Sequence, residues 1–240
     1  MDPMRFLWVL GFLEFRSLEQ LDLDMGSLEL ETKPLGSEIY LALGLNESTK
    51  RVPGTPRVLS LLSSFLERSV QKNEKLLETT KQKDIVTVFH GLRAPTLSIG
   101  QYIDRIFKYS NCSTSCFVVA HIYMERLLQN VDILLTSLNV HRIIITSVMV
   151  AAKFIDDAFF NNAYYAKVGG VSTAEINRLE MKFLFSLDFR LQVTVGTFER
   201  YCLQLEKEAS GRCQIERPIQ FCGLKESRQN IEEAKGATTV

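Results

Sequence analysis

The stretch that decides the fold reads Ile176-Asn177-Arg178-Leu179-Glu180-Met181-Lys182-Phe183-Leu184-Phe185-Ser186-Leu187-Asp188-Phe189. Its apolar residues recur at the spacing of one helix face: Ile176, Leu179, Phe183, Leu184 and Leu187. At about 100 degrees per residue, Glu180 falls inside this apolar stripe. A lone carboxylate in apolar surroundings is costly unless a cation or a set of donors meets it. The stretch therefore predicts an amphipathic helix with a buried carboxylate that has a partner.

The sequence around this helix favours further helices. No proline occurs between Pro95 and Pro218, and no glycine between Gln101 and Val168. Apolar spacing predicts helices from Ile99 to Tyr109, from Thr114 to about Gln129 and from Val140 to about Ile155, with an earlier one after Pro56. The fold class is all-α.

The predicted helix from Val140 to Ile155 is apolar nearly all round, which is typical of the central helix of a bundle. Lys153 is its only charge after Arg142, so it is the natural partner for Glu180. Two interpretations stay open on periodicity alone. The pair is either an internal salt bridge with no further role, or a charged feature retained for binding a partner.

Three polar residues carry local predictions. Asn139 is expected to cap the helix that begins at Val140. Ser172-Thr173-Ala174-Glu175 has the form of a capping box, which places the start of the last helix after Gly169-Gly170. His121 lies among apolar neighbours and is expected to be a core histidine with its hydrogen bonds satisfied.

Composition narrows the range of partners. The formal net charge is +0, with 28 basic and 28 acidic residues, which argues against binding nucleic acid or an anionic membrane. No apolar run reaches the roughly twenty residues of a membrane span. The apolar segment from Phe6 to Leu13 is flanked by Asp2 and Glu14 without a cleavage site, so it is not read as a secretion signal.

The five cysteines are Cys112, Cys116, Cys202, Cys213 and Cys222. Their odd number and spacing predict reduced thiols in a reducing compartment. Cys112 and Cys116 resemble half of a metal site, but no second pair completes it. We therefore expect no metal and no cofactor.

Four segments follow from these patterns. Residues 1–56 are expected to form a flexible arm, with 1–24 as an upstream extension because Met25 offers a second start. Residues 57–95 hold a helix and a linker, 96–191 the main helical domain, and 192–240 a helical extension that ends in a polar tail from Lys225 to Val240.

Three of these helices carry motifs that resemble the cyclin family. Ala151-Ala152-Lys153-Phe154-Ile155-Asp156-Asp157 is similar to the end of that family's third helix, and Arg178 to Phe189 to its fifth. Tyr123-Met124-Glu125-Arg126 is similar to its second-helix motif, with glutamate in place of aspartate. The resemblance implies a single five-helix cyclin box with an additional N-terminal helix and flexible termini.

Two further motifs resemble a narrower group, the plant P-type or U-type cyclins, which are similar to the fungal phosphate-pathway cyclin. They are Arg57-Val58-Leu59-Ser60-Leu61-Leu62 and Ile106-Phe107-Lys108-Tyr109-Ser110-Asn111-Cys112-Ser113.

The resemblance implies a non-catalytic regulator that binds and activates a cyclin-dependent serine/threonine kinase. Lys153 and Glu180 would hold the kinase interface, and apolar side chains would pack against the kinase's mobile helix: Val150, Phe154, Leu184, Phe189 and Leu191. The kinase's own lysine–glutamate pair could then form. No small-molecule substrate is implied, the location is the nucleus, the cytoplasm or both, and cell-cycle or phosphate signals would act through the complex.

Two departures from the family pattern limit this carry-over. The first helix reads Gln101-Tyr102-Ile103-Asp104-Arg105-Ile106 where many cell-cycle cyclins have a substrate-recruiting patch. The family's arginine–aspartate brace between helices has Glu125 as its acid, and the partner of Glu125 is open.

Two other classes of function remain. Asp156-Asp157 resembles the paired carboxylates of an isoprenoid synthase, although the third aspartate and a second acidic motif are absent from the sequence. A cyclin-fold scaffold or transcription-associated adaptor that activates no kinase is the nearer alternative.

Overall fold

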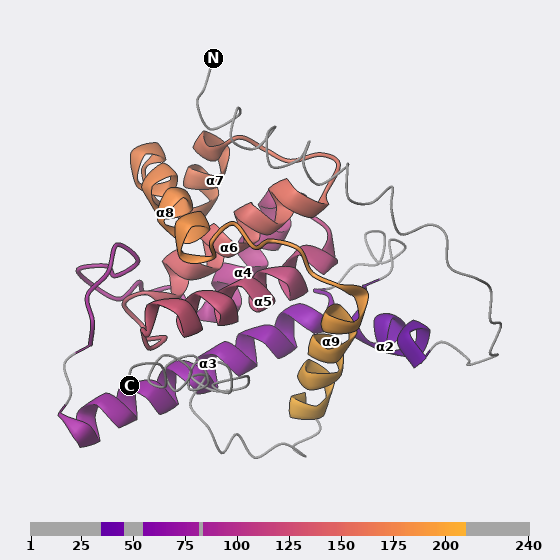
Figure 1. Ribbon diagram of the computed structural model, residues 1–240, viewed down its shortest axis with the longest axis horizontal. Helices are drawn as coiled ribbons and strands as arrows, with labels where there is room; N and C mark the ends of the chain where they lie inside the picture. The colour runs from indigo at the N-terminus through magenta and orange to yellow at the C-terminus, as the bar shows by residue number, and fades with distance from the viewer. Residues whose placement is uncertain (1–34, 46–54, 82–83, 210–240) are drawn as a thin grey trace, which may run out of the picture. The chain divides into compact units, whose positions relative to one another are not determined.

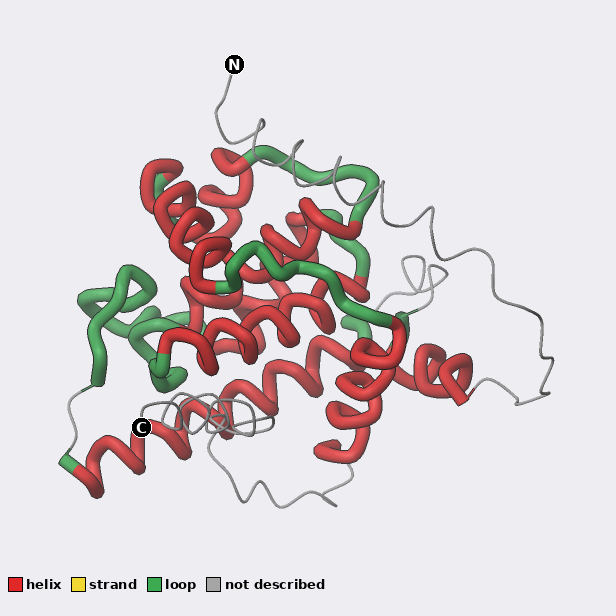
Figure 2. The backbone as a smooth tube through the Cα atoms, viewed as in Figure 1, coloured by secondary structure: helices red, strands yellow, loops and turns green. Residues whose placement is uncertain are grey.

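The computed structural model describes residues 35–45, 55–81 and 84–209, and within these ranges all regular structure is helical (Figures 1 and 2). The helices are α2 (Leu35–Leu43), α3 (Arg57–Thr80), α4 (Ile99–Ser110), α5 (Thr114–Val131), α6 (Val140–Ile155), α7 (Asn162–Gly169), α8 (Thr173–Ser186) and α9 (Val195–Ala209). Helices α4 to α8 are the five expected between residues 96 and 191, and α3 is the additional helix before them. The all-α, five-helix prediction is confirmed.

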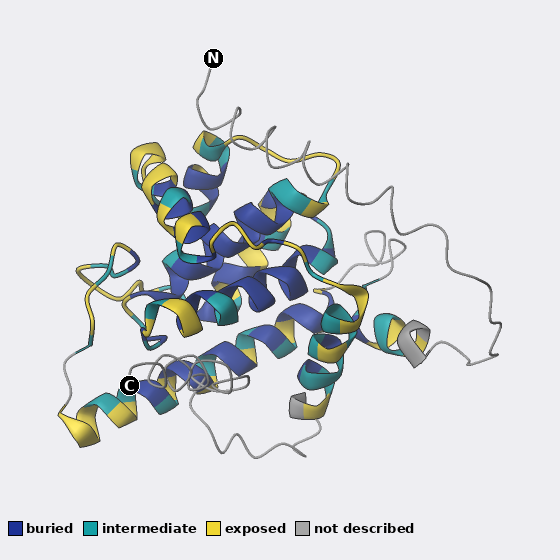
Figure 3. Cartoon of the chain, in the orientation of Figure 1, coloured by how far each residue is buried: buried dark blue, intermediate teal, exposed yellow. Residues whose placement is uncertain are grey.

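Helix α6 lies at the centre of these five helices. It packs beside α5 and also contacts α4, α7 and α8 (Figure 1). Nearly all of its residues from Val140 to Ala152 are buried, because neighbours cover it on every side (Figure 3). Helices α3 and α9 cover the other side of α5. The apolar sequence of α6 is thus explained by its central position.

Two glycines end α7 and let it approach α6. Gly170 takes the left-handed conformation with φ of 71°, which a Cβ would disfavour. A Cβ on Gly169 would lie 2.8 Å from Cγ1 of Ile145 on α6. These glycines are therefore needed both to turn the chain and to bring α7 against the central helix.

Residues 1–56 need a correction, because Leu35–Leu43 form α2. The hydroxyl of Tyr40 on α2 donates a hydrogen bond to Glu199 on α9 at 3.2 Å, and the Tyr40 ring packs against Phe198. Such long-range contacts leave no periodic signal in a nine-residue segment. The rest of the predicted arm, residues 1–34 and 46–54, and the tail from Lys225 lie outside the described residues.

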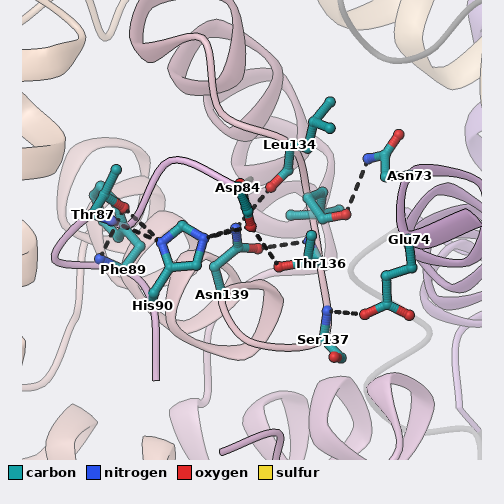
Figure 4. A network of polar contacts seen from close by, with 11 residues as sticks. Asn73, Glu74, Asp84, Thr87, Phe89, His90, Leu134, Thr136, Ser137 and Asn139 are labelled. Carbon is teal, nitrogen blue, oxygen red and sulfur yellow. Dashed lines mark hydrogen bonds and ion pairs between the residues drawn. The ribbon is translucent and has the colours of Figure 1, made fainter. Parts of the chain in front are cut away.

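Asn139 precedes α6 but does not cap it with its side chain, so this prediction was wrong. Its Oδ1 accepts from the Thr136 amide at 2.9 Å, and its Nδ2 donates to the Leu134 carbonyl at 2.8 Å. Nδ2 also lies 3.0 Å from Nε2 of His90, which contacts Asp84 (Figure 4). The amide thus ties residues 84–90 to the turn before α6.

His121 lies in the core as expected, but its hydrogen bonds are not satisfied. Among the described residues neither ring nitrogen has a hydrogen-bond partner. The ring packs edge-on against Phe65 of α3, with centroids 4.9 Å apart, and against Tyr201 of α9 at 5.5 Å. Burial lowers the pKa of His121 to about 4, so the imidazole is neutral near pH 7.

The capping prediction at the start of α8 holds for the serine alone. The Ser172 hydroxyl accepts a hydrogen bond from the Glu175 amide at 3.1 Å. The Glu175 carboxylate accepts from Nε of Arg142 on α6 at 2.7 Å. The Glu175 side chain, which a complete capping box would use to cap the helix, is therefore held instead in an ion pair with Arg142 of the central helix.

Candidate functional site

Lys153 and Glu180 join α6 to α8. Nζ of Lys153 donates to Oε1 of Glu180 at 2.6 Å. The Glu180 side chain is 0% exposed and that of Lys153 is 12% exposed. Glu180 lies on the inner face of α8, as its apolar stripe predicts, and Lys153 lies at the edge of the buried face of α6. The two charges that break the hydrophobic pattern therefore meet each other.

Asn162, in the first turn of α7, completes this pair. Its Oδ1 accepts from Nζ of Lys153, and its Nδ2 donates to Oε2 of Glu180 at 2.7 Å and to Oδ1 of Asn177 at 2.7 Å. Each Glu180 oxygen thus has its own donor, which buried carboxylates require. Sequence reasoning missed Asn162, because it follows a segment without helical periodicity.

The apolar residues assigned to the kinase interface differ in exposure. Val150 is 0% exposed, Leu184 3% and Leu191 6%. Phe154 is half-buried and Phe189 is 46% exposed. In the chain alone, Val150, Leu184 and Leu191 are core residues, and Phe189 is the one with a large exposed surface.

Other large apolar side chains are exposed near these positions in the chain. At the end of α6 and just after it these are Ile155, Phe159 and Phe160, and at the end of α8 Phe185. Phe160 stacks on Tyr164 with centroids 4.0 Å apart, and Phe185 packs edge-on against Phe189 at 5.3 Å. Phe185 lies outside the buried stripe of α8, and that displaced aromatic was a signal that sequence reasoning overlooked.

The backbone that presents Phe189 is unusual. Asp188 and Phe189 take consecutive left-handed conformations, with φ of 50° and 56°. An aromatic residue rarely adopts this conformation, which costs on the order of 1 kcal/mol. The Phe189 amide donates to the Leu184 carbonyl at 3.0 Å, which closes the end of α8. The turn therefore holds the Phe189 ring in an exposed position, although its backbone conformation is unfavourable.

Two side chains of α5 hold the chain just after this turn. Tyr123 donates to the carbonyl of Leu191 at 2.6 Å. Arg126 donates to the carbonyls of Arg190 at 2.8 Å and Gln192 at 3.0 Å. Residues 190–192 are therefore fixed to α5 through their backbone, and Phe189 is fixed with them.

Glu125 has a partner of a different kind from the brace that the family pattern implies. Its carboxylate accepts a hydrogen bond from the hydroxyl of Tyr201 on α9. Burial raises the pKa of Glu125, while this hydrogen bond acts in the opposite direction. The acid of the second-helix motif thus braces α5 against α9.

The Asp156 carboxylate is hydrogen-bonded to residues at the start of α5. Its carboxylate accepts from the Ser113 amide at 2.9 Å, the Ser113 hydroxyl at 2.8 Å and the Cys116 thiol at 3.1 Å. A carboxylate is favourable at a helix N-terminus. In the described ranges no three His, Cys, Asp or Glu side chains are placed to hold a metal ion. Asp156 therefore holds the start of α5 in place, which differs from the metal binding that an isoprenoid synthase would require of it.

Comparison with known proteins agrees with the fold and the motifs. A family model described as Cyclin matches residues 56–191, which is more than half of the chain. The chain belongs to the cyclin family.

Its relatives define the group more narrowly. It is 59% identical to Cyclin-P3-1 of Oryza sativa subsp. japonica over 198 residues, covering 82% of this chain and 84% of that protein. It is 54% identical to Cyclin-U3-1 of Arabidopsis thaliana over 195 residues, covering 81% and 88%. The predicted resemblance to plant P-type and U-type cyclins is confirmed.

Cyclins are regulatory subunits and not catalysts, so membership gives this chain a cyclin-type regulatory role connected with cyclin-dependent kinases. In the described ranges, none of the helices has the length and hydrophobicity that crossing a bilayer requires.

Proposed function

We propose that this chain binds a cyclin-dependent serine/threonine kinase and activates it by pressing the kinase's mobile helix inward. One observation carries the proposal: Lys153, Asn162 and Glu180 fix the end of α6 to α7 and α8, at the helix ends that bear exposed apolar side chains.

We assign two roles to the proposed interface residues according to their burial. Glu180 is fully enclosed, so it orients Lys153 and does not itself reach a partner. Val150, Leu184 and Leu191 support the surface from beneath. Phe154 and Phe189 contact the kinase helix, joined by Phe159 and Phe185 as further apolar contacts. Exposed aromatic residues are enriched among the side chains that dominate protein interfaces.

The test removes the charges and keeps the shape. In Lys153→Met with Glu180→Gln, the glutamine retains a hydrogen-bonding group toward Asn162 and no charge is left buried alone. Replacing both partners in this way is expected to change the unfolding free energy by no more than about 1 kcal/mol. Kinase binding should weaken by about 2 to 5 kcal/mol, because the interface loses a positioned charge.

The chain offers a matched control. Arg142→Met with Glu175→Gln removes a second ion pair between α6 and α8, in the first turn of α6 and roughly 16 Å along its axis from Lys153. This control should bind kinase like wild type. Affinity is measured by calorimetry against a panel of purified cyclin-dependent kinases, and activation by histone phosphorylation. Equal binding by wild type and the Lys153/Glu180 variant would refute the site.

The cyclin-fold scaffold or transcription-associated adaptor is the second candidate. It predicts that wild type raises no kinase's activity toward histone, while it co-purifies with a transcription complex. The same binding and activity measurements on wild type therefore decide between the two.

The resemblance to the fungal phosphate-pathway cyclin supports phosphate supply as an input, beside the cell cycle. Kinase activity recovered with this chain from phosphate-starved and phosphate-fed cells should then differ. Equal activity in both conditions, with a change across the division cycle, would favour the cell-cycle input.

A further inference from the structure

Two thiols lie close together where α4 passes into α5. Cys112 is 2% exposed and Cys116 0%, and they are within hydrogen-bonding reach of each other. Sγ of Cys112 lies 2.9 Å from the Ser110 hydroxyl, and Sγ of Cys116 lies 3.4 Å from the Ser113 hydroxyl. This is a buried dithiol with polar neighbours on both sides.

The dithiol is joined to the end of α6. Cys116 donates its thiol hydrogen to Oδ2 of Asp156 at 3.1 Å. Asp156 is the C-cap residue of α6 and stands three positions after Lys153. A change in the state of Cys116 therefore acts on the helix end that carries Lys153 and Phe154.

The two thiols differ in acidity. The contacts with the Cys116 side chain and with the Ser110 hydroxyl lower the pKa of Cys112, against burial and the Asp156 charge, which raise it. The contact with Cys112 and burial raise the pKa of Cys116. Cys112 is thus the thiol that ionises first, and the thiolate is the attacking form of cysteine. The buried hydroxyl of Tyr165 belongs to the same polar surroundings, and the charges of Cys112, Cys116 and Asp156 add to burial in raising its pKa.

We propose that Cys112 and Cys116 form a reversible disulfide that regulates the docking end of α6. The oxidant is a small-molecule disulfide such as glutathione disulfide. Cys112 thiolate attacks one of its sulfurs, forms a mixed disulfide and releases one small thiolate. Cys116 then attacks Cys112 and releases the second, while its proton passes to Asp156 and on to solvent. The two cysteines lose two electrons and the oxidant gains two, yielding two small thiols.

Oxidation removes the only hydrogen that Cys116 can donate to Asp156. The carboxylate keeps its two contacts with Ser113, but Ser113 stands between the bonded cysteines and moves with them. The predicted effect on the kinase rests on the proposed function; the disulfide itself does not. Because both sulfurs are buried, oxidation is limited by local opening of the turn between α4 and α5.

The first experiment detects the bond directly. Full-length protein is incubated with glutathione disulfide, alkylated and digested with trypsin. Cleavage after Lys108 and Arg126 places both cysteines on one peptide, Tyr109 to Arg126, whereas Cys202 falls on another. The expected result is a peptide lacking two hydrogen atoms and resistant to alkylation, restored by dithiothreitol. Full alkylation of both cysteines after prolonged oxidation would overturn the proposal.

The second experiment measures kinase affinity before and after oxidation. Wild type should bind at least about fivefold more weakly when oxidised, the lower range of allosteric coupling, and recover on reduction. Cys116→Ser keeps a donor for Asp156 but cannot form the bond, and Cys112→Ser blocks it from the other side. Both should be insensitive to oxidation.

The outcomes separate the two proposals. Unchanged wild-type affinity despite the bond, or equal sensitivity in both serine variants, contradicts regulation by the dithiol. Failure of reduced wild type to bind any kinase contradicts the proposed function instead, while the peptide measurement still decides whether the disulfide forms.

Discussion

Glu180 and His121 are both buried ionisable side chains, yet their surroundings are opposite. Glu180 lies among α6, α7 and α8, with a cation and an amide on its two oxygens. His121 lies among α3, α5 and α9, with aromatic rings around it and no hydrogen-bond partner among the described residues.

The difference shows two ways to bury a titratable group. At Glu180 the fold supplies a cation and an amide as partners, and at His121 it supplies no partner and the ring is neutral near pH 7. The charged arrangement occurs beside the proposed docking surface, and the neutral one where α3 and α9 cover the opposite side of α5. The comparison therefore separates a part of the core that serves binding from a part that serves packing.

The largest expected effect comes from removing the cation at Glu180. Lys153→Ala should lower the unfolding free energy by about 3 to 5 kcal/mol, because a buried carboxylate loses its counter-charge. Urea unfolding measures this. Arg142→Ala breaks a pair between the same helices that is more exposed, at 24% and 23%, and should cost about 1 kcal/mol or less. Similar losses of unfolding free energy in both variants would show that the buried Lys153–Glu180 pair matters no more for stability than the Arg142–Glu175 pair.

At His121 the prediction concerns pH. Its pKa is about 4 in the folded chain against an ordinary 6.5, so between these values the unfolded chain binds the proton that the folded chain refuses. Its contribution to stability is complete above pH 6.5 and is lost as pH falls toward 4, by about 3 kcal/mol in total.

His121→Phe should abolish this loss while still packing against Phe65 and Tyr201. His141→Gln is the comparison, because burial also lowers the pKa of His141 while its hydrogen bond to the Leu97 carbonyl opposes that shift, so this variant should remove a smaller part of the loss. Unfolding curves from pH 7 to pH 4.5 compare the two. An unchanged pH slope in His121→Phe would show that other groups produce it.

Variants of Asn162 make a smaller change to the surroundings of Glu180. Asn162→Ala removes one donor from Glu180 and one acceptor from Lys153 but leaves their ion pair, so we expect a loss of about 1 to 3 kcal/mol. Asn162→Asp places a second carboxylate beside Glu180 and should destabilise more than alanine at neutral pH. Equal stability of the two variants would argue against a charge-sensitive site.

The smallest effect is a gain in stability. Phe189→Asn places a residue that tolerates the left-handed conformation at φ of 56° and should stabilise the chain by up to about 1 kcal/mol, offset in part by the lost contact with Phe185. Kinase binding should weaken in the same variant. Phe185→Ser, which removes an exposed ring from regular helix, should weaken binding with no gain in stability.

The fifth helix, α7, was expected only from the resemblance to cyclins. The residues themselves were sufficient to predict α4, α5, α6 and α8 and the pairing of Lys153 with Glu180. Both depend on local periodicity: the apolar stripe of α8 and the uniformly apolar α6 each contain one charge out of pattern. Such a mismatch identifies a residue that needs a partner, and the second mismatch identifies the partner.

The missed features depend on distant contacts. Asn162 meets Glu180 only because Gly169 and Gly170 let α7 pack against α6, and Glu125 meets Tyr201 only because α9 folds back on α5. Asn139 follows a capping pattern, but its amide is held by Thr136 and Leu134 instead. The helix propensity and periodicity of a local segment give no information about such contacts.

The contacts that α5 makes with residues 190–192 place few constraints on which side chains can occupy positions 190 and 192. Tyr123 and Arg126 bind only carbonyl groups there, and every amino acid has one. The exposed side chains of Arg190 and Gln192 can consequently diverge without altering the path of the chain or the aim of Phe189. Related cyclins could acquire different partner preferences at these two positions while keeping a common docking geometry.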